Sequence, residues 1–123
     1  MRIKIIFHKA FDVAHSDDAM KVMLRGEVAA RIQYEVMVDA NIRVQSGMHP
    51  TDVLNELWHM TQNDLYATGW RSHNFPGLTA CRSSMVGDVF MLDGVGYVVQ
   101  PTGFKKIDDL GMTAHFLQMA PVS

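Results

Sequence analysis

Six histidines and one cysteine are the side chains best suited to metal binding or nucleophilic catalysis in this sequence. No histidine pair has HExxH spacing, and Cys81 has no second cysteine with which to form a ligand pair. Cys81 and a histidine could form a nucleophile–base pair, but its surroundings match no catalytic signature, and a lone cysteine is usually a small buried hydrophobe. We therefore expect no metal ligands, no cofactor and no catalytic residues.

The segment 63–82, NDLYATGWRSHNFPGLTACR, is the preferred functional region. It has no sustained hydrophobic period, and connections of this length are functional or contain a short unrecognised element. Trp70 and Phe75 would form a partner-binding patch if exposed, because aromatic anchors dominate interface energetics; if buried, they would pin the loop to the core. Arg71 and His73 lie between them and complete this part of the candidate binding surface.

The segment 83–107, SSMVGDVFMLDGVGYVVQPTGFKKI, predicts a turn followed by a β-hairpin. Asp93-Gly94 can adopt positive φ and reverse the chain between the apolar runs 89–92 and 96–99, and Gly96 indicates a bulge or a wider loop. Ser84 and Asp88 are candidate ligand-binding residues at the turn; alternatively, they hydrogen-bond local backbone. After Gly103, Phe104 should lie on the sheet while Lys105 stays solvated, and both are candidate site residues.

Two other classes of function remain open. A small-molecule pocket or minor enzyme between helix and sheet would require polar groups to converge, with perturbed pKa values, from His59, His73, Asp88 and Tyr97. Nucleic-acid binding would require one face to carry Arg71, Arg82, Lys105 and Lys106. Because the net charge is -2 and no basic run exists, we do not expect a nucleic-acid partner.

The elements around these residues predict an α+β domain. Strand alternation covers residues 2–7, with Ile3 and Ile5 opposite Arg2 and Lys4, and residues 30–40, where one face is apolar. Helices are expected from the Ser16 N-cap either to Gly26 or on through EVAA at residues 27–30, and from Pro50 through about residue 62. We expect a small antiparallel sheet of about four or five strands, covered on one face by one or two helices and including the C-terminal hairpin. The tail 111–123 could add an edge strand or a short helix.

The whole chain is expected to be one domain, residues 1–123, because its length and its 48% hydrophobic content are ordinary for a globular protein. No apolar segment is long enough to span a membrane, the N-terminus does not resemble a signal peptide, and a single cysteine suits a reducing compartment. We therefore expect a cytoplasmic protein without a membrane partner. Pairing of exposed strand edges, at the hairpin or at residues 30–40, into a homodimer is a further hypothesis.

Residues 33–107 resemble the YodL-like domain family of phage, plasmid and other mobile-element proteins. The resemblance rests on QYEVMVDANI, PTDVLNELWHMTQN, SHNFPG, SSMVGDV and TGFKKI in this order. Met85 stands where the family has Leu, Gly87 where it has Ser, and the connection from helix to turn is long. The resemblance implies the fold and a mobile-element origin, and it implies no biochemical activity.

The leading functional hypothesis is a non-enzymatic binding module, encoded on a mobile genetic element, that engages a protein partner through residues 63–82. The alternative is a small-molecule-binding protein or minor enzyme with a pocket between helix and sheet.

Overall fold

The computed structural model describes residues 1–121, which form two compact units. The first unit comprises residues 1–43 and the described residues from Met85 onward, and the second comprises Val44–Ser84. The single domain expected over residues 1–123 stays a prediction, and residues 122–123 of the tail lie outside the described residues.

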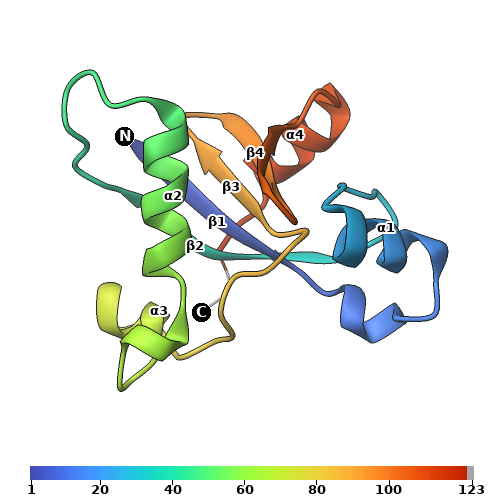
Figure 1. Cartoon of the computed structure of the whole chain (residues 1–123), viewed down its shortest axis with the longest axis horizontal. Helices are drawn as coiled ribbons and strands as arrows, with labels where there is room; N and C mark the ends of the chain where they lie inside the picture. Colours follow the sequence, from blue (N-terminus) through green and yellow to red (C-terminus); the bar gives the residue numbers. More distant parts are fainter. Residues whose placement is uncertain (122–123) are drawn as a thin grey trace. The chain divides into compact units, whose positions relative to one another are not determined.

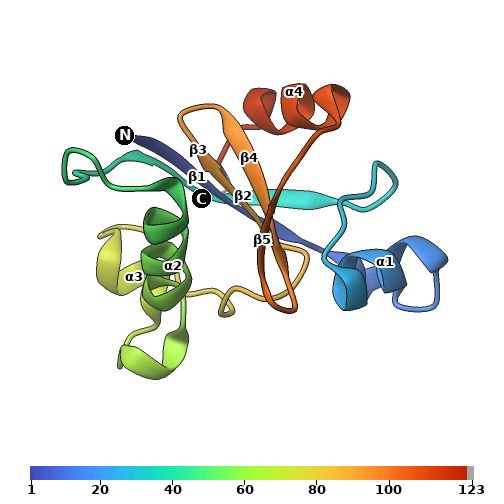
Figure 2. The ribbon, with the colours of Figure 1, turned by 45° about the horizontal axis from the view of Figure 1, so that its top comes forward.

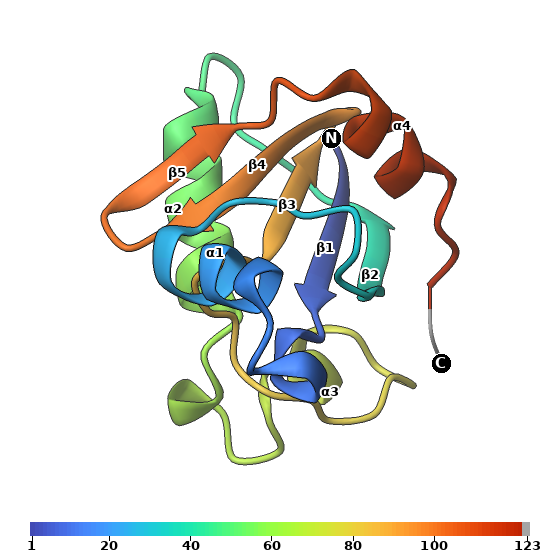
Figure 3. The same cartoon turned by 90° about the vertical axis from the view of Figure 1, so that its right-hand side faces the viewer.

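A five-stranded antiparallel sheet forms the first unit, in the order β2-β1-β3-β4-β5 (Figure 3). Its strands are β1 (Arg2–His8), β2 (Tyr34–Asn41), β3 (Val89–Leu92), β4 (Val95–Gln100) and β5 (Gly103–Lys106). The helical elements of this unit are η1 (Ala10–Val13), α1 (Asp17–Arg25) and α4 (Leu110–Gln118). The predicted α+β fold with a small antiparallel sheet is confirmed.

Helices α1 and α4 pack on the same face of this sheet (Figure 1). Their buried side chains share one apolar cluster with sheet residues, and this cluster includes Ala19, Val22, Met112, Phe116, Ile6, Val36, Val89, Met91 and Val98. The tail therefore supplies a short helix. Pro121 then forms an isolated parallel bridge to Val36 on the outer side of β2.

Helix α1 begins at the predicted N-cap and ends at Gly26, the earlier of the two ends that the sequence allows. The Ser16 Oγ accepts the backbone N–H of Ala19 at 3.1 Å, as an N-cap side chain does. Gly26 closes the helix in the left-handed conformation, with φ +66°.

Strand β1, which lies between β2 and β3, departs from its predicted alternation of apolar and charged residues. Lys4 is buried, and its Nζ donates to the carbonyl oxygens of Phe116, Leu117 and Met119 at 3.1, 2.8 and 2.9 Å. These carbonyls lie at the C-terminal end of α4, where a cation compensates for unsatisfied acceptors and the helix dipole. Lys4, a charged residue in the strand pattern, thus anchors α4, which is more than a hundred residues away in sequence.

The prediction that residues 30–40 form one strand with a single apolar face is wrong. Ile5 pairs with Val38 and Ile6 pairs with Val36, so Met37 is an extra residue, a β-bulge in β2. Because Ile5 and Ile6 point to opposite faces of the sheet, Val36 and Val38 do so too. Both valines are buried, so the apolar side chains of β2 do not share the one face that the sequence predicts.

The predicted hairpin of β3 and β4 is confirmed, with Asp93 (φ +47°) and Gly94 (φ +84°) as a two-residue turn. The bulge expected at Gly96 is absent: Gly96 pairs with Met91, and a Cβ there would lie 3.0 Å from the side chains of Met91 and Ile107. Gly96 therefore gives Ile107 space to pack. The sheet also continues beyond Pro101, because residues 103–106 form the unpredicted strand β5.

The second unit contains α2 (Pro50–Met60), η2 (Asn63–Leu65) and α3 (Trp70–Asn74), of which Figure 2 shows the two α-helices. Pro50 occupies the first turn of α2, as predicted, and His49 is the N-cap, its Nδ1 accepting the Thr51 N–H at 3.2 Å. The short elements η2 and α3 explain why the segment 63–82 shows no single period.

Candidate binding sites

Asn63 holds the two arms of the segment 63–82 together. Its backbone N–H donates to Ser83 Oγ at 2.8 Å, and its side-chain Nδ2 donates to the Cys81 carbonyl at 2.7 Å. Its Oδ1 accepts the Trp70 N–H at 2.9 Å. Trp70 Nε1 in turn donates to the Arg82 carbonyl at 2.8 Å. These bonds link η2, the start of α3 and residues 81–83 into one rigid loop.

A second clamp closes the base of this loop at Ser84. The hydroxyl oxygens of Thr61 and Ser84 lie 2.5 Å apart, and Gln62 Nε2 donates to Ser84 Oγ at 2.9 Å. The backbone N–H of Ser84 donates to the Thr61 carbonyl at 3.0 Å. Ser84 is only 4% exposed. The structure therefore assigns this predicted ligand-binding residue to the support of the loop.

Trp70 is fully buried, which corrects the interpretation of this residue as part of an exposed patch. The half-buried ring of Phe75 meets it edge-on at a centroid distance of 6.5 Å. Arg71 is 2% exposed, and its guanidinium donates to the carbonyl and hydroxyl oxygens of Thr79, each at 3.3 Å. The alternative interpretation, in which the aromatics pin the loop, matches this arrangement.

The exposed side of the same loop presents other residues. Leu65, at the end of η2, is 63% exposed. His73 is exposed on α3, and its ring lies against that of Tyr66 at a centroid distance of 4.6 Å. Of the predicted site residues in this segment, His73 is the exposed one. The sequence does not indicate Leu65 or Tyr66, because no local signal separates an exposed apolar side chain from a buried one in an aperiodic segment.

Asp88, in the first unit, is fully buried before β3. Its carboxylate accepts the backbone N–H of Met85 at 2.7 Å and that of His8 at 3.0 Å. These bonds confirm the alternative in which Asp88 hydrogen-bonds backbone at the turn. They also join the turn before β3 to the end of β1.

Phe104 and Lys105 lie side by side in sequence on β5 but on opposite faces of the sheet. Phe104 is half-buried, with its ring 6.0 Å from that of Phe90. Lys105 is exposed and pairs with Val98, whose side chain belongs to the face covered by α1 and α4. Both positions match the expectation that Phe104 lies on the sheet while Lys105 is solvated.

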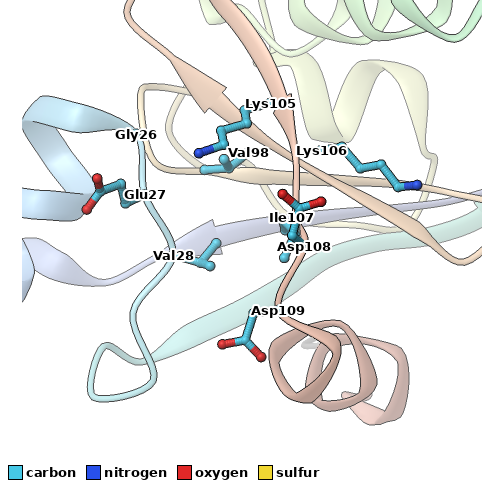
Figure 4. A pocket seen from close by; sticks show the side chains of 9 residues that line it. All are labelled: Gly26, Glu27, Val28, Val98, Lys105, Lys106, Ile107, Asp108 and Asp109. Carbon is cyan, nitrogen blue, oxygen red and sulfur yellow. The ribbon is translucent and has the colours of Figure 1, made fainter.

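Lys105 lines a cavity of about 290 Å³ between the end of α1 and the strands β4 and β5. Val28, Val98 and Ile107 give it apolar walls, and charged residues surround them: Glu27, Lys105, Lys106, Asp108 and Asp109. Figure 4 shows the side chains of Lys105 and Lys106 extending in opposite directions, as expected of neighbours on a strand. Lys105 is therefore the lysine whose side chain extends toward Glu27 in this view.

The polar set predicted for a pocket is divided between the two units. His59 and His73 are exposed in the second unit, while Asp88 and Tyr97 belong to the first. Asp88 is engaged by backbone N–H groups, and the cavity beside Lys105 is lined by none of the four. Neither Asp88 nor Tyr97 therefore supplies a polar group to the cavity of the first unit.

The basic set considered for nucleic-acid binding does not form one surface. Arg71 is buried in its loop, and Lys105 and Lys106 point to opposite faces of β5. Such a distribution does not provide the continuous positive surface that phosphates require.

No family model, curated protein or solved structure matches this chain. The resemblance to the YodL-like family therefore stays a prediction. Within residues 1–121, no group of three or more histidine, cysteine, aspartate or glutamate side chains could hold a metal ion. The helices in the same part of the chain are too short or too polar to cross a membrane.

Proposed function

We propose that this chain is a binding module whose recognition surface is the exposed side of the loop 63–82, formed by Leu65, Tyr66 and His73. The observation that carries this proposal is the contrast between the two sides of the loop. Its inner side is fixed by the Asn63 bonds and by buried Trp70, whereas Leu65 is largely exposed and the ring of half-buried Tyr66 packs against that of exposed His73. A preorganised surface loses little conformational entropy on binding.

The partner in this proposal is a protein. The exposed leucine offers apolar contact, the tyrosine and histidine rings add polar edges, and tyrosine is enriched at protein interfaces. The resemblance to mobile-element domains adds the setting: a module encoded on a phage, plasmid or similar element, acting in the cytoplasm on a host or element protein. It acts by occupying its partner, without catalysis.

The test begins with identification of the partner by chemical cross-linking in a cell extract, followed by calorimetry with the purified proteins. We expect Leu65→Ala and His73→Ala each to weaken binding about tenfold or more, equivalent to about 1.4 kcal/mol. The matched control is Leu110→Ala, since Leu110 is 83% exposed and lies on α4 in the other unit. Equal affinity of all three variants and the wild type would contradict the proposal.

A second candidate function is small-molecule binding in the cavity beside Lys105, which its apolar walls and charged rim favour. A thermal-shift screen against nucleotides, metabolites and divalent metals tests it, since a ligand at about 100 times its dissociation constant stabilises by about 2.7 kcal/mol. A genuine ligand of this cavity should lose its shift with Lys105→Ala and keep it with Lys21→Ala, because Lys21 is exposed and does not line the cavity. If both variants keep the thermal shift, the ligand binds elsewhere.

A further inference from the structure

Exposed apolar side chains gather on one short part of the first unit. Among the described residues, the large hydrophobic side chains that remain exposed include four within fourteen consecutive positions: Phe11 (52%), Val13 (47%), Met20 (51%) and Leu24 (60%). We call these four residues the α1 patch. Clustered exposed apolar side chains of this kind mark interaction sites.

The α1 patch extends over two neighbouring elements. Met20 and Leu24 are four residues apart on α1, so they lie one above the other on the same side of the helix. Phe11 and Val13 belong to η1, which lies beside α1 (Figures 1 and 3).

Helix α1 cannot rotate to bury Met20 and Leu24 within its own unit. Its opposite side already packs against the sheet, because Ala19 and Val22 are fully buried in the core. The packing there is very close: a Cβ on Gly87 would lie 2.5 Å from Val22 Cγ1, and a Cβ on Gly26 would lie 2.5 Å from the Val99 carbonyl oxygen. The helix is therefore held against the sheet with Met20 and Leu24 turned outward.

The charges of α1 are separated along its length. Asp17 and Asp18 stand in the first turn, whereas Lys21 and Arg25 occupy the middle and the last turn. Two such helices in antiparallel contact would bring the acidic end of each beside the basic part of the other. The opposed helix dipoles favour the same arrangement. A parallel contact would instead bring like charges together.

We propose that the α1 patch is the interface of a homodimer, in which the two α1 helices pack antiparallel about a twofold axis. Such an interface is isologous, with Met20 and Leu24 of both copies at its centre and the charged ends paired on each side. The occupant of the α1 patch is a second copy of this chain. The apolar centre of one patch can pack against that of another, and the acidic end of each α1 then lies beside the basic part of the other.

This interface differs from the strand-edge pairing expected from the sequence. The β3–β4 hairpin is not an edge, since β5 pairs with β4, and the outer side of β2 carries the bridge from Pro121. The remaining edge strand, β5, has four residues, and short edges pair poorly with another chain.

The first test is sedimentation velocity of the full chain from about 1 µM to about 300 µM, where a weak to moderate dimer becomes populated. We expect a concentration-dependent dimer of the wild type and a monomer of Leu24→Glu over the whole range. The matched control, Leu110→Glu, places the same charge at a more exposed leucine on α4 and should leave the dimer intact. A monomeric wild type, or a dimer that survives Leu24→Glu, overturns the proposal.

The second test exchanges charges, with folding of every variant checked by circular dichroism. Asp17→Lys with Asp18→Lys makes α1 wholly basic, and Lys21→Asp with Arg25→Asp makes it wholly acidic. Each variant alone should lose at least about tenfold in self-affinity through like-charge repulsion, while an equimolar mixture should form heterodimers that weaken in salt. If the variants self-associate as the wild type does, or if folded variants fail to pair when mixed, the antiparallel interface is wrong.

Discussion

The carboxylate of Asp88 accepts the backbone N–H of His8 across 80 positions of the sequence, at 3.0 Å. The two side chains are fully buried, with His8 Nε2 and Asp88 Oδ1 3.8 Å apart. The imidazole is held as well: Nε2 lies 3.0 Å from the Val86 carbonyl, and Nδ1 accepts the Ala10 N–H at 3.1 Å. The neutral ring with its proton on Nε2 satisfies both bonds. The turn before β3 and the end of β1 are thus joined through one carboxylate and one imidazole.

Asp88→Asn should destabilise the first unit by about 1–3 kcal/mol, because one amide oxygen cannot replace both carboxylate oxygens and leaves a buried backbone N–H without its acceptor. Urea unfolding followed by circular dichroism measures the loss. Asp93→Asn is the control, since Asp93 also accepts a backbone N–H, from Arg2 at 2.8 Å, but at an exposed turn. Equal effects of the two substitutions would show that burial of Asp88 adds nothing.

Lys4→Met should loosen the C-terminal end of α4, because three backbone carbonyls lose the ammonium group that they share. We expect a cost of about 1–3 kcal/mol in the free energy of unfolding and faster amide hydrogen exchange in residues 112–119. Lys105→Met removes an exposed lysine and should change stability by no more than about 0.5 kcal/mol. Unchanged exchange in α4 would contradict the anchoring role of Lys4.

The sequence predicts the parts of this fold that depend on local rules. The Asp93-Gly94 turn, the Ser16 N-cap of α1 and the position of Pro50 all follow from which backbone conformations and hydrogen bonds those residues allow. The bulge at Met37, the burial of Lys4 and the strand β5 do not. Each depends on a partner distant in sequence, so no local pattern indicates it.

The candidate sites divide in the same way. The sequence identifies the segment 63–82 as unusual, since an aperiodic connection of that length is rare. It does not distinguish Trp70, which is buried and bonded to Asn63 and to the Arg82 carbonyl, from Leu65, which is exposed, because both are large apolar residues in an aperiodic segment. The sequence does not predict the α1 patch for a related reason. Met20 and Met23 lie on the same helix, and only packing against the sheet makes Met23 partly buried while Met20 stays exposed.

Gly26→Ala should destabilise the first unit by more than the cost of the left-handed backbone alone. An alanine there would carry that cost, about 1 kcal/mol, and its Cβ would also lie 2.5 Å from the Val99 carbonyl oxygen, so α1 must shift away from β4. Gly94→Ala is the matched control: its φ is +84°, and its Cβ would meet only Leu117 Cδ2 at 3.8 Å. Thermal melts should therefore show a larger loss for Gly26→Ala, and equal losses would contradict the close approach.

Tyr34 should make the folded chain sensitive to alkali. The pKa of Tyr34 is raised to about 12, chiefly by burial; the hydrogen bond from the Ala29 N–H lowers this pKa, and the nearby Asp88 charge contributes a smaller rise. Because the folded pKa lies above the unfolded value of about 10, the contribution to stability is complete below pH 10. It is then lost as the pH rises through about 12, by about 2–3 kcal/mol in total.

Urea unfolding at several pH values from about 9 to about 12 measures this loss. Tyr34→Phe is the control: it should lose about 1 kcal/mol at neutral pH, where the Ala29 N–H loses its acceptor, and should show a smaller decline in alkali. The same decline in both proteins would assign the alkaline sensitivity to other groups.

Asn63→Ala tests whether the loop 63–82 is a preorganised surface. The substitution removes the acceptor of the Trp70 N–H and the donor to the Cys81 carbonyl, while the backbone bond to Ser83 can remain. We expect residues 64–82 to exchange their amide hydrogens faster and to be cleaved sooner in limited proteolysis, with the sheet of the first unit unchanged. Asn55→Ala, on the exposed side of α2, should leave both measurements as they are in the wild type.

The same substitution tests the proposed function. Because binding through Leu65 and His73 depends on a fixed loop, Asn63→Ala should also lower the affinity for the partner severalfold, although Asn63 does not contact the partner. A loop that loosens while affinity stays constant would separate the rigidity of this segment from its proposed function.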